Sequence, residues 1–267
     1  MSTGISVDID EILDVALRGV RRASMFMGLG VNAANNEHVR AYQLTGISQI
    51  QLLPNDIPED QLAKAKDEFR LWVEANGFRE LIETFHVFLD AINLACLKFQ
   101  LGKGSISLED LNADHAAFSK QGLPNKLNIV RQKYGVEAKH ADHLLSLNGA
   151  RNVLTHSLSI VRKKDANAEG VMTVSWLGAD ILIEESNGTQ HHIEEVIEQG
   201  RSFPEETRLL MHFTVRNREF SVGDRLVLSS KDLGEVCWFM TREAEALASS
   251  LIEHAKRNGI EFRGEET

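Results

Sequence analysis

The sequence predicts an α+β protein, in which an N-terminal helical bundle is followed by a small antiparallel sheet and a C-terminal helix. Apolar residues recur at helical spacing from residue 8 to about 160. Strand-like segments and turn signals dominate 171–228, and helical spacing returns over 231–258. Helices followed by strands are typical of the α+β class. We therefore expect a helical domain over 1–160, with a β-rich region and terminal helix over 161–267 packed on it.

Composition indicates a globular protein of the cytoplasm. The 267 residues are enough for a sizeable core, and 43% of them are hydrophobic and 25% charged. Residues 1–13 lack the basic and apolar regions of a signal peptide, and the most apolar run, 85–99, is too polar and too short to span a bilayer. Cys96 and Cys237 lie far apart in apolar contexts, which favours buried thiols in a reducing compartment. We expect no membrane contact.

The net charge of −10 argues against a nucleic-acid-binding protein held by bulk electrostatics. Any RNA contact must therefore come from a local basic patch. The candidate RNA-binding residues flank the helix that carries the catalytic candidates described below. They are Arg131, Lys133, Arg162, Lys163 and Lys164.

The first helices are predicted from apolar periodicity and from glycine and proline signals. The pattern predicts a helix over 8–27 that ends at Gly28-Leu29-Gly30, and a weaker, polar helix over 32–44. A proline followed by two acidic residues begins a longer helical stretch, 58–101, with a break at Asn76-Gly77.

Capping signals predict the next helices. Ser107 and Asp110 form a capping box for a helix that ends near Ser119. A Leu-Pro pair begins another helix, over 123–135, and a further helix begins near Glu137. We expect these helices to complete the bundle.

The C-terminal half is predicted to form a small antiparallel sheet. Asn187-Gly188 is a hairpin signal between two strand-like segments. A helix over 231–258 ends at Asn258-Gly259. The expected strands are 171–176, 181–184, 209–215 and 225–228.

Three residues of the helix before the strands are the catalytic candidates: Arg151, Asn152 and His156. The spacing of an arginine and a histidine is uninformative by itself, because Arg79 and His86 have a similar spacing in another helix. We interpret that second pair as structural, since it lies on one face of a helix that resembles a core helix. The surrounding sequence distinguishes the first pair.

The segment LNGARNVLTHSLSIV, residues 147–161, resembles the signature helix of the HEPN superfamily. That motif is Arg, then a polar residue that is often Asn, then His after four to six intervening residues. The resemblance covers roughly 8–160. It implies a helical bundle that forms a homodimer with two Arg/His sets in a shared cleft. Active members cut RNA without a metal ion and leave a 2′,3′-cyclic phosphate, whereas inactive members bind or scaffold other molecules.

The same resemblance implies partners and a biological setting. It implies RNA as substrate, a second copy of the chain, and a role as a toxin or in anti-phage defence. An antitoxin or another regulatory protein is then an expected partner. We expect no cofactor and no metal; His140 and His143, three residues apart on a helix, are interpreted as solvated residues, with metal ligation the less favoured alternative.

The residue types suit this chemistry. Histidine titrates near neutral pH and can transfer a proton to or from ribose oxygens, and arginine offers a permanent bidentate charge to phosphate. Asn152 shares a helix face with His156 and can orient its imidazole. Arg151 and His156 are five residues apart, roughly 140° around an ideal helix, so they cannot easily converge within one straight helix.

Structural roles remain open for the same residues. His156 lies near a helix C-terminus, where the helix dipole favours a cation. Arg151 can pair with a nearby carboxylate, and Asn152 can be an ordinary buried amide. An inactive HEPN-like module that binds a protein or a nucleotide is therefore the alternative function.

Overall fold

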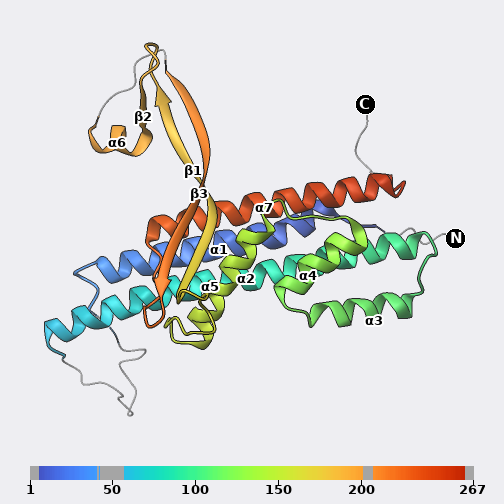
Figure 1. The fold of residues 1–267 in the computed structure, drawn as a ribbon, viewed down its shortest axis with the longest axis horizontal. Helices are drawn as coiled ribbons and strands as arrows, with labels where there is room; N and C mark the ends of the chain where they lie inside the picture. The colour runs from blue at the N-terminus through green and yellow to red at the C-terminus, as the bar shows by residue number, and fades with distance from the viewer. Residues whose placement is uncertain (1–5, 41, 43–56, 201–206, 262–267) are drawn as a thin grey trace.

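The computed structural model describes residues 6–40, 42, 57–200 and 207–261 (Figure 1). It confirms the α+β class, with N-terminal helices, a three-stranded antiparallel sheet and a C-terminal helix. The elements in chain order are α1 (Ile9–Asn35), α2 (Glu59–Gly102), α3 (Leu108–Ser119), α4 (Leu123–Ile129), the π-helical turn η1 (Val130–Tyr134), α5 (Ala141–His156), β1 (Val171–Glu184), β2 (Gln190–His192), α6 (Ile193–Glu198), β3 (Arg208–Ser221) and α7 (Ser230–Arg257).

Helices α1 and α2 form a close antiparallel pair, and two predicted interruptions in them are wrong. Helix α1 continues through Gly28 and Gly30 to Asn35, and α2 is unbroken at Gly77. A Cβ on Gly77 would overlap the Met27 side chain, and one on Gly30 would overlap Val73. These two glycines therefore allow the helices to approach, and they do not end them.

The weaker helix predicted over 32–44 is not observed in the described residues beyond the last turn of α1. Residues 36–40 are not helical, and residues 41, 43 and 44 lie outside the described residues. The capping box of α3 is confirmed: Ser107 accepts a hydrogen bond from the Asp110 backbone, and the Asp110 carboxylate accepts one from Ser107 N.

The sheet has the order β2-β1-β3 and consists mainly of one long two-stranded ribbon. Strands β1 and β3 pair continuously from Val171 opposite Ser221 to Glu184 opposite Arg208, so the two predicted segments 171–176 and 181–184 form one strand. The turn predicted at Asn187-Gly188 joins β1 to β2. Figure 1 shows the ribbon crossing the helices and extending beyond them, with β2 and α6 near its far end.

The predicted strand 225–228 is absent. The segment makes one isolated antiparallel bridge, between Ile160 and Arg225, and then leads into α7. Leu226 N donates to Ser159 O (2.7 Å), so this segment runs beside the chain that leaves α5.

One hydrophobic core includes residues from both sides of the expected boundary at 160. Helix α7 lies alongside α1 and α2 and contacts β1, and its buried face joins the same cluster as the buried faces of α2 and α5. A capping box of Ser229 and Asp232 begins α7. Among the described residues, no helix has both the length and the apolar character needed to cross a membrane.

Candidate functional site

Arg151 lies in a seam between α5 and α2. Its guanidinium forms an ion pair with Glu83 of α2 and donates from Nη1 to the Asn152 side-chain oxygen (3.0 Å). The arginine side chain is 19% exposed and the glutamate 47%. The Asn152 amide thus contacts Arg151, whereas the sequence suggested that it orients His156.

The guanidinium is incompletely satisfied and lies near a second positive charge. Its Nε atom is buried and has no hydrogen-bond partner in the part of the chain that the structure describes. Burial, followed by the charge of Arg79, lowers the pKa of Arg151 below its ordinary value. A phosphate oxygen that entered this seam could accept a hydrogen bond from Nε. The charge of the phosphate would also offset the positive charges of Arg151 and Arg79.

His156 is the last residue of α5 and is exposed to solvent. Its backbone carbonyl accepts a hydrogen bond from Arg162 Nη2 (3.3 Å). No hydrogen bond joins its imidazole to Arg151 within the described part of the chain. The single chain therefore leaves the two catalytic candidates apart, with Arg151 in the seam and His156 at the open end of the helix.

The chain leaves α5 through a backbone conformation that side chains disfavour. Leu158 has φ 50° and Ser159 has φ 66°, both in the left-handed region. The Leu158 side chain is 85% exposed. Residues held in this region without glycine cluster at functional sites, because the surrounding structure must stabilise them.

The α2 side of the seam contains residues that the sequence interpretation treated as structural. Arg79, Glu83 and His86 are spaced at i, i+4 and i+7 and share the helix face that meets α5. His86 bonds with the Asn148 side chain, and its pKa is lowered by burial and then by Lys126. The helical spacing of these residues indicated a shared helix face. No pattern in the neighbouring sequence indicated that this face packs against α5, which carries Arg151.

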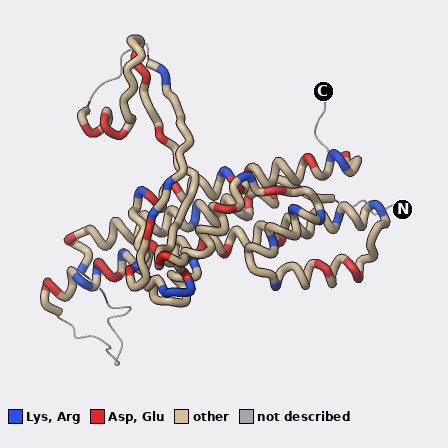
Figure 2. Tube along the Cα trace, in the orientation of Figure 1, with Lys and Arg blue, Asp and Glu red and all other residues tan. Residues whose placement is uncertain are grey.

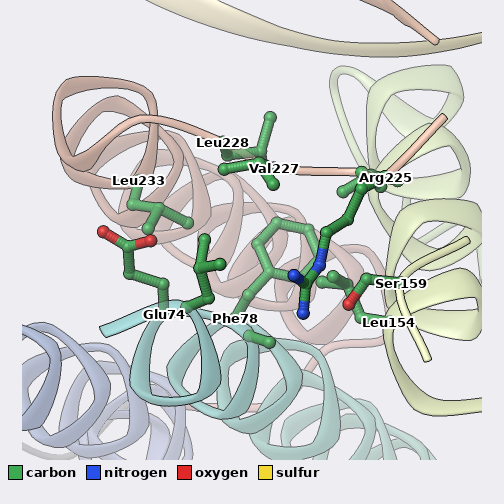
Figure 3. Close-up of a pocket in the computed structure, with 11 residues that line it drawn as sticks. Glu74, Phe78, Leu154, Ser159, Arg225, Val227, Leu228 and Leu233 are labelled. Atoms are coloured by element: carbon green, nitrogen blue, oxygen red, sulfur yellow. The ribbon is translucent and has the colours of Figure 1, made fainter. Parts of the chain in front are cut away.

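An open groove begins where the seam ends. It has a volume of about 850 Å³ and is lined by residues of α2, the end of α5 and the segment before α7. A small pocket of about 20 Å³ shares Leu154, Ser159 and Arg225 with it, and has room for about one water molecule. Figure 3 shows Arg225 beside Phe78, Leu154 and Ser159.

The predicted RNA-binding residues fall into two separate places. Arg162, Lys163 and Lys164 are exposed in the turn that follows α5, near His156. Arg131 and Lys133 belong to η1, where they pair with Glu137 (4.0 Å) and Asp114 (2.8 Å). Figure 2 shows basic and acidic residues mixed along the helices. The predicted RNA-binding residues therefore do not form one patch: one group follows α5 and the other lies in η1.

The comparisons with known proteins add nothing to this geometry. No family model, curated protein or solved structure matches this chain. The functional interpretation therefore depends on the residues and contacts described above.

His140 and His143 are not free in solvent, so their interpretation as solvated residues is wrong. The His140 ring bonds to the buried Glu243 carboxylate (Nδ1–Oε1 2.6 Å), and His143 Nδ1 lies 2.9 Å from Ser175 Oγ. Both contacts tie the start of α5 to α7 and β1. Within the described ranges, no cluster of three or more His, Cys, Asp or Glu residues could hold a metal ion.

Proposed function

We propose that this chain is a metal-independent endoribonuclease of the HEPN type. In the proposed reaction a ribose 2′-oxygen attacks the adjacent phosphorus while the P–O5′ bond breaks. The products are a 2′,3′-cyclic phosphate and a 5′-hydroxyl. The 2′-hydroxyl loses a proton to a base and the 5′-oxygen gains one, so no metal ion or cofactor is required.

One observation carries the proposal: the exposed residue His156 lies in the chain between residues that line the groove. Its neighbours Thr155 and Leu158 line that groove, and Arg162 contacts its carbonyl. An imidazole that is open to solvent can exchange protons with a bound ribose. We assign proton transfer to His156 and phosphate stabilisation to Arg151, with Asn152 holding the guanidinium.

A homodimer is part of the proposal, because one chain does not bring His156 to Arg151. A symmetric pair would place the histidine of one copy near the arginine of its partner. A role as a toxin or in anti-phage defence, a cytoplasmic location and an antitoxin or other regulatory partner also belong to the proposal. They rest on the motif resemblance alone.

A catalytically inactive module is the second candidate, and the Arg151–Glu83 pair favours it. A neutralised guanidinium offers less charge to a phosphate in the transition state. Such a module would bind a protein or a nucleotide without cutting RNA.

The test is cleavage of a labelled, structured RNA in EDTA. We expect the wild-type chain to cut and to leave cyclic-phosphate ends. We expect His156→Ala and Arg151→Ala to reduce the rate at least 100-fold, since general acid–base catalysis contributes about 10²- to 10⁴-fold. The matched control is His212→Ala, which removes an exposed histidine of β3. Equal cutting by all four proteins would reject the site, and no cutting by a confirmed dimer would favour the inactive module.

A further inference from the structure

The groove beside α5 exposes flat apolar surface that the fold does not use. Trp72 and Phe69 of α2 line it with 63% and 42% of their surface exposed, and Leu158 lines it from the other side. Residues 69, 72, 76 and 79 follow one face of α2, so the two rings lead towards the seam that holds Arg151.

The same groove contains two arginines that have no ion-pair partner among the described residues. Arg79 lines it from α2 and Arg225 from the segment before α7, and neither forms a salt bridge within residues 6–40, 42, 57–200 and 207–261. Many other arginines of the chain are paired, for example Arg22 with Glu80. Glu68 is the one acidic residue that lines the groove in the described part of the chain. The groove is therefore locally positive on a chain of net charge −10.

We infer that this groove binds single-stranded RNA, with a base stacked on Trp72 and backbone phosphates at Arg79 and Arg225. The inference rests on the proposed function and specifies the form of its substrate. Aromatic faces next to cations are the usual means of binding single strands, because every unpaired base offers a face for stacking. Bases within a duplex are already stacked and paired, and cannot lie against Trp72.

Within the described ranges, the wall of the groove contains a residue with an unpaired polar group. Thr155 lines it, and the buried hydroxyl of this residue has no hydrogen-bond partner among the described residues. Thr155 lies one helical turn after Arg151, on the same face of α5. Rotation about the Cα–Cβ bond of Thr155 would turn this hydroxyl into the groove, where it could bond a ribose hydroxyl or a base edge.

An apolar protein surface is a less favourable partner for this groove than a single-stranded RNA. An apolar partner covering Trp72 would also remove water from Arg79 and Arg225 and leave both charges unpaired, which is costly. A polyanion with flat bases satisfies the rings and the charges together.

The experiment measures binding of a single-stranded 2′-O-methyl oligouridine, which lacks the attacking hydroxyl and cannot be cut. We expect the single strand to bind more tightly than a 2′-O-methyl duplex of the same length. Trp72→Ala should weaken binding about 5- to 150-fold, since stacking on an aromatic ring contributes roughly 1–3 kcal/mol per base. Trp72→Phe should retain most of the affinity, because it keeps a stacking face. The control is Phe26→Ala, which removes an exposed ring of α1 outside the groove.

The charged residues give an independent measurement. Arg225→Gln should weaken binding and lower the slope of log affinity against log salt by about 0.7. Lys120→Gln, which removes an exposed cation after α3, should change neither the affinity nor the slope.

The outcomes separate this inference from the proposed function. Binding that Trp72→Ala and Arg225→Gln leave unchanged would overturn the inference even if RNA is cut. Binding lost in both variants, by a chain that cuts no RNA, would support the groove and reject the nuclease. In a further outcome, Trp72→Ala converts the dimer into a monomer that still binds the oligouridine. This result would overturn the inference and identify the groove as a contact between two copies of the chain.

Discussion

At the scale of single residues, Glu83 decides how much charge Arg151 can offer. The Glu83 carboxylate is paired with the same guanidinium that a phosphate would have to contact. The Glu83 side chain is the more exposed member of this pair. Because the glutamate is about half exposed, water can replace it at small cost. A phosphate can therefore compete with Glu83 for Arg151.

Replacing Glu83 by glutamine should strengthen RNA binding. We expect Glu83→Gln to raise the affinity for the 2′-O-methyl oligouridine about 2- to 5-fold, because exposed ion pairs contribute up to about 1 kcal/mol. The matched control is Glu80→Gln, one turn away on α2, whose carboxylate pairs with Arg22 of α1. The competition is disproved if both variants bind like the wild type in fluorescence anisotropy.

At the scale of elements, the contact between α1 and α2 depends on glycines that face the partner helix. Gly77 meets Met27, and Gly19 meets Thr84. Gly28 belongs to the same helix as Gly19, but nothing lies within 4 Å of the Cβ it lacks. A larger side chain would therefore disturb the helix contact at Gly19 but not at Gly28, although both glycines belong to α1.

Alanine substitutions should separate these effects. Gly77→Ala should lower the free energy of unfolding by about 1–3 kcal/mol, since overpacking displaces neighbouring side chains. Gly28→Ala should raise it by roughly 0.5–1 kcal/mol, because alanine restricts the unfolded chain and favours the helix. Urea unfolding monitored by circular dichroism measures both. A destabilised Gly28→Ala, or an unchanged Gly77→Ala, would contradict the proposed packing.

Elements fixed by local chemistry could be predicted from the sequence, whereas those fixed by distant contacts could not. The capping box at Ser107 is complete within four residues, so its prediction was correct. Gly77 was interpreted as a break because its partner Met27 is far away in the sequence. The strand prediction at Arg225 was wrong for a related reason. This segment contacts Ser159 and Ile160, which follow α5 and are far from Arg225 in the sequence. The groove combines three distant segments, and no local pattern indicated it.

At the scale of the whole molecule, buried and partly buried histidines link the stability of the core to pH. Burial lowers the pKa of His86, His143 and His254 below the ordinary 6.5. These residues lie at separate contacts: His86 in the α2–α5 seam, His143 against Ser175 of β1, and His254 beside Tyr134. Each must stay neutral for its contact to keep its full stability.

Stability should fall on mild acidification. The unfolded chain binds protons at these histidines near pH 6.5, and the folded chain binds them only at lower pH. Their contribution is thus complete above about pH 6.5 and is lost as pH falls through the lowered values of the folded state. We expect the free energy of unfolding from urea titrations to be lower at pH 5.5 than at pH 7.5. His254→Gln should reduce the difference, and equal stability at both pH values would refute the assignment.

The position of α7 also has a consequence for how the chain is made. Helices α1 and α2 leave the ribosome first, but α7 covers their shared surface and is translated after every other element described. Until then, part of the apolar face that α7 covers is open to water on the nascent chain. Exposed apolar surface of this kind is prone to association during synthesis. Efficient production of this protein should therefore depend on chaperones that hold the nascent bundle until α7 emerges.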